Sequence, residues 1–353
     1  MGMIKTGWDS NVIWSVSAGG KNSDLGSKVY QLTDGSLICA GTFTDTITGS
    51  PKQKEILVVK LSSSGSVVWK KTYGGAGNQT AQDIVKTSDG FIILGSTDIE
   101  RQPVSDSTGN EAGKPDILLL KITETGDSVN SVPHGLGKND IGAAIKPDNT
   151  GKYVVLGTTE RSLSGQAKNN LFLIRVNSLG DAIEQNFIGG MDDEVAADME
   201  VLTDGYLLAY TVGKDMANQK IQVTKLKNDI YAQPYFSNSI TITDPVNPDI
   251  SSCGVNSVSR YNTDSFVLAG YSGTGSTSRM MVFEMDGNGN PVAGNQVIKG
   301  STGIQVAYDV VAGDDGYIIA VGKNSYDINS MITLLKFRFW VKTSVNPEKS
   351  PNQ

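Results

Sequence analysis

The chain has 353 residues and a net charge of −7. Phosphate backbones and anionic membrane surfaces attract basic faces, so this balance argues against nucleic acid or lipid headgroups as partners. Glycine is abundant, with 40 residues against 11 prolines, and 38% of the residues are apolar, which is typical of an all-β chain with many turns. No apolar run reaches about 18 residues, so we expect no transmembrane segment.

The chain opens with residues 1–10, which we interpret as an N-terminal extension, followed by a strand over residues 11–17 that ends before Gly19-Gly20. Residues 67–73 have the same character and precede Gly74-Gly75. The strand at residues 11–17 therefore matches the last strand of a repeating unit, and it stands alone at the start of the chain.

Six units of about 56 residues follow it. Each opens with a strand near a small residue and continues through a tight turn, Asp-Gly in four units, into an apolar run. Asp-Gly between two such runs predicts a hairpin, because a type I′ turn needs positive φ. The small residues are Gly26, Ala81, Gly142, Ala196, Gly254 and Ala307, and the apolar runs cover residues 37–41, 91–95, 153–157, 206–210, 266–270 and 318–322.

A second apolar run follows in every unit after a loop of variable length, and a more polar strand ends the unit. Five of these runs carry a basic residue at one position, namely Lys60, Lys121, Arg175, Lys225 and Lys336. Recurrence at one strand position indicates a structural role. The recurring Asp83, Asp198 and Asp309 are candidate partners.

Each unit thus reads as four strands whose composition predicts their burial. The strand with the small residue tolerates crowding, the two apolar runs suit strands covered on both faces, and the mixed strand suits an outer edge. Such a sheet cannot bury both faces alone, but neighbours stacked radially can cover it. The predicted fold is all-β, a six-bladed β-propeller of four-stranded antiparallel blades.

The sixth unit has no clear fourth strand. We therefore predict that residues 11–17 pair with residues 331–338 and close the ring by completing the last blade. The predicted organisation is an extension over residues 1–10, one propeller domain over residues 11–340, and an extended or disordered tail over residues 341–353.

The repeat resembles one found in many bacterial secreted, periplasmic and surface-lipoprotein β-propellers. The motif is a Trp–aromatic–Gly-Gly strand, an Asp-Gly hairpin and a strand ending in Val-Lys-Leu, and residues 67–95 match best. The resemblance implies an extracytoplasmic, non-enzymatic protein whose signal or lipid anchor is not present in this chain. It provides no catalytic residues.

The long, uneven connections between second and third strands, and between units, are predicted to share one face, where binding residues tend to lie. The alternative is that they are solvated insertions without a ligand. The candidate binding residues in these connections are Asp98, Glu100, Arg101, Asp106, Glu111, Asp192, Asp193, Asp244 and Asp249.

Individual motifs indicate little chemistry. His134 is the only histidine, and its place at a strand end favours a structural role over a catalytic one. The Asp286–Asn290 segment is similar to the start of a calcium loop, but it aligns with the tight turns of the other units. The acidic run from Asp192 to Glu194 could bind a cation or be an exposed loop. Cys39 is predicted to be buried and Cys253 could be exposed, without a disulfide between them. We expect no metal and no cofactor.

These observations favour a non-catalytic binding or scaffold protein of the bacterial cell envelope, contacting a protein or a glycan through the long-loop face. The alternative is a carbohydrate-active propeller enzyme, a hydrolase or lyase with carboxylates near the axis, because a pair of carboxylates can come together only in space.

Overall fold

The computed structural model forms two compact units, Met1–Ser239 and Ile240–Gln353. The structure describes the whole chain except residues 8–10, 45–52, 76, 99–114, 137, 161–167, 191, 214–217, 228, 243–251, 301–302, 327–328 and 340–353.

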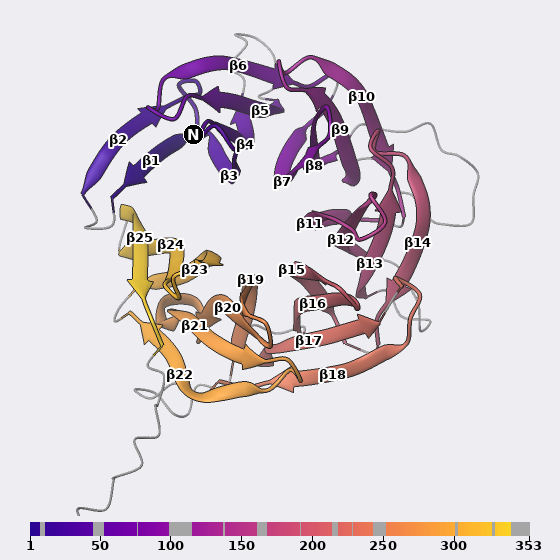
Figure 1. Cartoon of the computed structure of the whole chain (residues 1–353), viewed down its shortest axis with the longest axis vertical. Helices are drawn as coiled ribbons and strands as arrows, with labels where there is room; N and C mark the ends of the chain where they lie inside the picture. The colour runs from indigo at the N-terminus through magenta and orange to yellow at the C-terminus, as the bar shows by residue number, and fades with distance from the viewer. Residues whose placement is uncertain are drawn as a thin grey trace, which may run out of the picture. The chain divides into compact units, whose positions relative to one another are not determined.

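The first unit contains a two-stranded sheet and four successive four-stranded antiparallel sheets (Figure 1). The two-stranded sheet is β1 (Gly2–Thr6) and β2 (Val12–Ser17). The four-stranded sheets consist of β3 (Leu25–Gln31), β4 (Leu37–Thr44), β5 (Lys54–Leu61) and β6 (Val67–Tyr73); β7 (Gln79–Thr87), β8 (Gly90–Thr97), β9 (Asp116–Thr123) and β10 (Ser128–His134); β11 (Asp140–Pro147), β12 (Tyr153–Glu160), β13 (Asn169–Val176) and β14 (Ala182–Ile188); and β15 (Glu194–Leu202), β16 (Gly205–Val212), β17 (Lys220–Lys227) and β18 (Pro234–Ile240).

The second unit contains one four-stranded and one three-stranded antiparallel sheet. The strands are β19 (Cys253–Asn262), β20 (Ser265–Ser272), β21 (Arg279–Asp286) and β22 (Pro291–Lys299), then β23 (Ile304–Ala312), β24 (Ile318–Tyr326) and β25 (Asn329–Phe337). Each of the six repeat units in the sequence forms one sheet, which confirms the six-bladed β-propeller as the fold class.

The burial of the strands follows the predicted order. The apolar runs β8 and β9 are buried along almost their whole length, whereas β6 alternates between exposed and half-buried residues. One core cluster joins Leu94 and Leu119 of one blade to Val155 and Phe172 of the next. The small residue of the first strand is also explained, because a Cβ at Gly142 would lie 2.5 Å from Leu94 of the preceding blade.

A register shift directly follows that small residue in five repeats, lies one residue later in the fifth repeat, between Val255 and Ser257, and was not predicted. In β7 it lies between Ala81 and Asp83, and in β11 between Gly142 and Ala144. Such a bulge changes the direction of the next side chains. It accompanies the placement of Asp83 against the next blade, where its carboxylate accepts a hydrogen bond from the backbone N–H of Ile145 at 2.9 Å.

The N-terminal segment differs from its predicted pairing. β2 pairs with β1 in a sheet of its own, and β25 is the last strand of a three-stranded sheet. β1 lies within the segment interpreted as an extension. Its sequence matches the third strand of a blade, with Lys5 paired to Trp14 as Lys60 is paired to Trp69. Pairing with the adjacent β1 needs only a short connection, so this local hairpin takes the place of the long-range pair.

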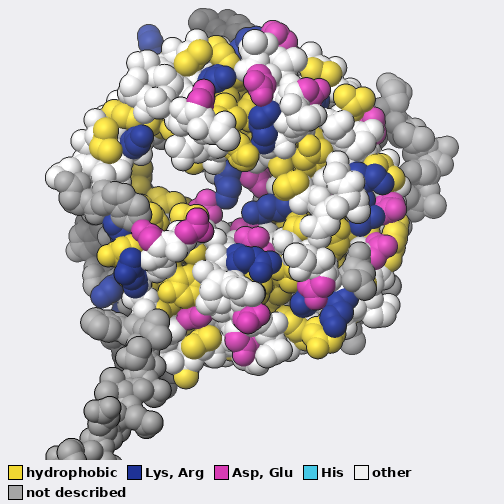
Figure 2. Space-filling view, in the orientation of Figure 1, with side chains coloured by type: hydrophobic (Ala, Val, Ile, Leu, Met, Phe, Trp, Pro, Cys, Tyr) yellow, Lys and Arg dark blue, Asp and Glu magenta, His cyan; other side chains and the backbone are white. Residues whose placement is uncertain are grey.

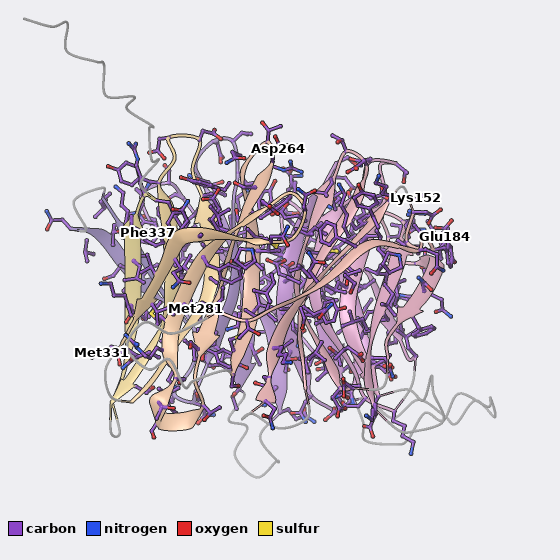
Figure 3. The ribbon with its side chains drawn as sticks, turned by 90° about the horizontal axis from the view of Figure 1, so that it is seen from below. Lys152, Glu184, Asp264, Met281, Met331 and Phe337 are labelled. Atoms are coloured by element: carbon purple, nitrogen blue, oxygen red, sulfur yellow. The ribbon has the colours of Figure 1, made fainter. Side chains whose placement is uncertain are left out.

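The first and third turns lie at the same end of the strands in the blades β7–β10 and β11–β14. In β11–β14, Lys152 in the first turn and Glu184 beyond the third turn lie at one end of the strands (Figure 3). In the preceding blade, Lys86 near the end of β7 forms an ion pair with Glu124 of the third turn at 2.8 Å. In these two blades the first and third turns therefore share one end of the strands.

The recurring basic residues are structural, as predicted, but their partners are different. Lys121 Nζ lies 2.5 Å from Asp89, and Lys225 Nζ lies 2.9 Å from Asp204, so the partner in both is the Asp of the Asp-Gly turn. Arg175 Nε lies 2.9 Å from Asp148 at the corresponding turn. The turn aspartate faces the third strand across the sheet, whereas Asp83 is directed at the next blade.

Replacing Lys121 by Ala is expected to lower the free energy of unfolding by about 3 kcal/mol, because its buried stem would leave a cavity. The side chain is fully buried and its ammonium group also bonds the Thr87 hydroxyl. Lys121→Met keeps the stem and removes the ammonium group together with its desolvation cost, so a loss of only about 1 kcal/mol is expected. Urea unfolding of both variants measures the difference. Equal losses would show that the charge, and not the stem, stabilises the blade.

The structure also shows the surroundings of His134, of the Asp286 segment and of Cys253. The His134 imidazole Nε2 lies 2.9 Å from the Gly180 carbonyl oxygen in the neighbouring blade, which agrees with a structural role. Asp286 accepts hydrogen bonds from the backbone N–H groups of Asn288 and Asn290, so this segment is the predicted turn. Cys253 is fully buried, contrary to the suggestion that it could be exposed, because its side chain at the start of β19 packs beside the Ile240 carbonyl, 3.7 Å from its Sγ; both cysteines are free. None of the described segments forms a helix long and apolar enough to cross a bilayer.

Candidate functional site

The candidate site is a crevice of about 290 Å³ in the first unit, between the end of β14 and the sheet β15–β18. It opens beside the connection from β14 to β15, within the long-loop region that the sequence favoured. Its lining combines an acidic wall with a row of hydroxyl and amide groups. The lining residues are Ile188, Gly189, Gly190, Asp192, Glu194, Tyr210, Val212, Gln222, Thr224, Pro234 and Ser237.

Glu194 is the buried acid of the crevice, with only 7% of its surface exposed. Its Oε1 accepts a hydrogen bond from the Gly190 N–H at 3.0 Å, and its Oε2 has no hydrogen-bond partner among the described residues. Burial, followed by the negative charges of Asp192 and Asp193, raises the pKa of Glu194 to about 7. This carboxyl group can therefore change protonation near neutral pH.

The bond to Gly190 is itself a repeated structural element. In other blades the first residue of the inner strand also accepts from the N–H four residues earlier, as Gln79 does from Gly75 and Asp140 from Leu136. One oxygen of Glu194 therefore holds the connection between blades. The second oxygen is buried and has no hydrogen-bond partner among the described residues.

A chain of hydroxyl groups runs along the opposite wall. The Tyr210 hydroxyl lies 2.9 Å from Thr224 Oγ1, which lies 2.9 Å from Ser237 Oγ. Gln222 Nε2 donates to the same serine oxygen at 2.8 Å. Burial raises the pKa of the Tyr210 phenol, so it remains a neutral donor and acceptor.

The blade β7–β10 has a crevice at the equivalent place, with a volume of about 330 Å³. When the third strands of the two blades are aligned on their recurring lysine, Leu118 and Leu120 occupy the positions of Gln222 and Thr224. Gln79 stands where Glu194 stands, and in all six repeats Thr224 is the only polar residue at its position. The β15–β18 crevice is thus the polar, acidic version of a recess that the fold repeats.

Tyr210 is a second departure from the repeat. The other five units have glycine there, namely Gly41, Gly95, Gly157, Gly270 and Gly322. At each of those positions a Cβ would overlap a backbone carbonyl of the first strand, such as that of Thr80 beside Gly95. In this one blade the backbone accommodates a tyrosine, whose hydroxyl group joins the polar wall.

The predicted site residues fall into three groups. Asp192 lines the crevice and is exposed. Asp193 and Asp98 instead have structural contacts, because Asp193 accepts from the Asn169 N–H at 3.0 Å and Asp98 accepts from Asn78 Nδ2 at 2.7 Å. The remaining predicted residues lie outside the described part of the chain; they are Glu100, Arg101, Asp106, Glu111, Asp244 and Asp249.

Sequence reasoning missed Glu194, Tyr210, Gln222, Thr224 and Ser237 as one site. The first two gave a signal, since Glu194 belongs to the acidic run and Tyr210 replaces the recurring glycine. Aligning the third strands would also have marked Gln222 and Thr224. Among the described residues, no group of three acidic, histidine or cysteine side chains could hold a metal ion.

Stability is expected to depend on the protonation of Glu194. The folded pKa of about 7 exceeds the ordinary 4.5, so the folded state binds the proton more tightly than the unfolded chain. The contribution is therefore fully present below pH 4.5 and is lost as the pH rises toward 7, by at most about 3 kcal/mol. Glu194→Gln should remove this loss, and glutamine already occupies the equivalent position 79. Urea unfolding at pH 5 and pH 8 tests it; an equal pH effect in both proteins would contradict the assignment.

Neither a protein-family model nor a curated protein matches this sequence. Among solved structures, the sialidase of Trypanosoma rangeli in complex with the inhibitor DANA is similar with a TM-score of 0.54 and 10% identity, covering 95% of this chain and 57% of that one. The arabinofuranosidase Arb93A of Fusarium graminearum has a TM-score of 0.50 and 12% identity, covering 88% and 91%.

Kuenenia stuttgartiensis hydrazine synthase is similar to the same extent, with a TM-score of 0.50 and 11% identity over 88% of this chain and 95% of that one. At such low identity the likeness shows the fold alone. A sialidase, an arabinofuranosidase and a hydrazine synthase do not share one chemistry, so the function must be argued from the site.

Proposed function

We propose that this protein is a non-catalytic glycan-binding protein of the bacterial cell envelope, and that the β15–β18 crevice holds the sugar. The main support for the proposal is a difference between two blades. Leucines line the recess in β7–β10, whereas hydrogen-bonding side chains occupy the same positions in β15–β18. The repeat in β7–β10 shows that the fold does not require this polarity, since Leu118 and Leu120 line the same recess there.

The chemistry of the crevice suits a saccharide. A sugar ring presents hydroxyl groups that both donate and accept, and Tyr210, Thr224 and Ser237 offer the same capacity. Gln222 adds a side-chain amide, and Glu194 adds an acceptor that no described residue uses. The volume of about 290 Å³ lies at the small end of ligand pockets, which favours one or two sugar units.

The surface gives no competing signal for a polyanion. On the face drawn in Figure 2, basic and acidic side chains are intermixed, without a broad area of one sign. Among the residues that the structure describes, no lysine or arginine lines the crevice. The envelope location in this proposal depends on the resemblance of the repeat to bacterial secreted and surface β-propellers.

The test is isothermal titration calorimetry of the purified full chain against a panel of mono- and disaccharides. We expect at least one neutral sugar to bind with a stoichiometry of one, because only one blade carries the polar set. Absence of binding across the panel, together with binding of an envelope protein in a pull-down, would replace the glycan by a protein partner.

A carbohydrate hydrolase is a second candidate, favoured by the presence of two carboxyl groups, Asp192 and Glu194, in one crevice. A carboxyl group with a pKa of about 7 could serve as a general acid at neutral pH. However, hydrolysis needs carboxyl groups on both sides of the glycosidic bond, and these two are only two residues apart on one connection. Release of nitrophenol from nitrophenyl glycosides, lost in Glu194→Gln, would establish the enzyme over the binding protein.

A further inference from the structure

We propose that the β15–β18 crevice recognises a ligand with a primary ammonium group, such as an amino sugar, through Glu194 Oε2 and the carboxylate of Asp192. This inference rests on the proposed saccharide site and specifies the class of sugar. It follows from the arrangement of charge in the crevice and from the hydrogen-bond inventory of Glu194.

One carboxylate oxygen of Glu194, Oε2, has no hydrogen-bond partner among the described residues. Glu194 is more than nine-tenths buried, and a buried carboxylate oxygen without a partner is costly. Glu194 lines the crevice; the Gly190 N–H bonds its Oε1, and its Oε2 is buried without a partner among the described residues. A hydrogen-bond donor from a ligand would satisfy it.

The charged side chains that line the crevice are acidic. The charged residues of the described lining are Asp192 and Glu194, and none of the described lining residues is basic. Asp193, next in the chain, is directed at the Asn169 N–H and adds further negative charge. An ammonium group offers three donors and a positive charge, so it fits both the unpaired oxygen and the uncompensated acidity better than a neutral hydroxyl group does.

The crevice suits an ammonium group better than a metal ion. Calcium takes six to eight oxygen ligands, and magnesium requires an octahedron. No cluster of three acidic, histidine or cysteine side chains occurs among the described residues, so the protein side-chain ligands are few. An ammonium group needs only two or three acceptors, which Glu194, Asp192 and the hydroxyl wall supply.

The test is calorimetric titration of the full chain at pH 7.5, above the pKa of about 7 of Glu194, with glucosamine, glucose and N-acetylglucosamine. Glucosamine is expected to bind about tenfold more tightly than glucose, and N-acetylation should abolish the preference because it removes the charge. In Glu194→Gln the ratio of the two affinities should fall to about one. Asp181→Asn removes the same charge from a turn at the other end of a blade and should keep the ratio.

Each result decides between the two proposals. Equal affinities for glucosamine and glucose in the unmodified protein would overturn the ammonium site and leave the saccharide site standing. Binding of ethanolamine without binding of any sugar would overturn the saccharide and retain the ammonium site. Failure of all probes would overturn both. Displacement of glucosamine by calcium, or a preference that persists in Glu194→Gln, would also overturn the assignment.

Discussion

A chain carrying Tyr210→Phe, Gln222→Leu and Thr224→Val is expected to bind its saccharide about 100-fold more weakly than the unmodified protein. Each replacement keeps the approximate shape of a side chain and removes its hydrogen-bonding group. A hydrogen bond contributes about 1 kcal/mol net, and every 1.4 kcal/mol is a factor of ten in affinity, so three lost bonds give this magnitude. Calorimetric titration of both proteins with the same sugar measures the change.

The same variant should remain folded, with a free energy of unfolding within about 1 kcal/mol of the original. Tyr210 and Thr224 bond each other, and removing both partners of a buried pair is nearly neutral. The matched control is Ser131→Ala in the equivalent crevice of β7–β10, which should leave binding unchanged. Unchanged binding in the triple variant, or reduced binding in the control, would remove the crevice of β15–β18 from consideration.

Replacing Asp83 by Ala is expected to lower the free energy of unfolding by about 2–5 kcal/mol. Its Oδ1 accepts from its neighbour Ile84 at 2.8 Å, and its Oδ2 accepts from Ile145 of the next blade at 2.9 Å. Alanine would leave two buried N–H groups without acceptors, each costing about 1–3 kcal/mol. Urea unfolding measures the loss, and faster amide hydrogen exchange at Ile145 would show that the contact between the blades has opened.

Two further variants make this result specific. Asp83→Asn retains one carbonyl acceptor and should cost less than alanine. Asp127→Ala breaks an ion pair to Lys71 on an exposed turn, where the aspartate side chain is 69% exposed, and should cost less than about 1 kcal/mol. A loss at Asp127 as large as that at Asp83 would refute the view that the bulge-borne aspartate joins the blades.

Burial also bears on the charge of Asp83. Desolvation raises the pKa of this carboxyl group above its ordinary value, although Lys28 and Lys146 act in the opposite direction. The folded state therefore holds its proton more tightly than the unfolded chain does. This contribution to stability is complete at low pH and declines as the pH rises above the ordinary carboxyl range.

The sequence alone was enough to predict the four-stranded blade and its sixfold repetition. A glycine or alanine, an Asp-Gly turn and two continuous apolar runs recur six times, and each feature reflects a local requirement of turn geometry or of burial on two faces. For the same reason, the structural roles of His134, the Asp286 turn and the recurring lysines could be predicted. The position of Asp192 on a long connection could also be predicted, because exposed connections between blades are where ligand contacts arise.

The tertiary structure decided what depends on neighbours in space. Which aspartate pairs with Lys121, and whether residues 12–17 pair with a strand nearby or a strand far along the chain, are questions of geometry between segments. The site is the clearest instance. Glu194, Tyr210, Gln222 and Ser237 come from four different strands, and no one of these strands indicates by itself that the four residues share a site. Only the antiparallel register of β15–β18 brings their side chains to one crevice, and burial in that crevice raises the pKa of Glu194.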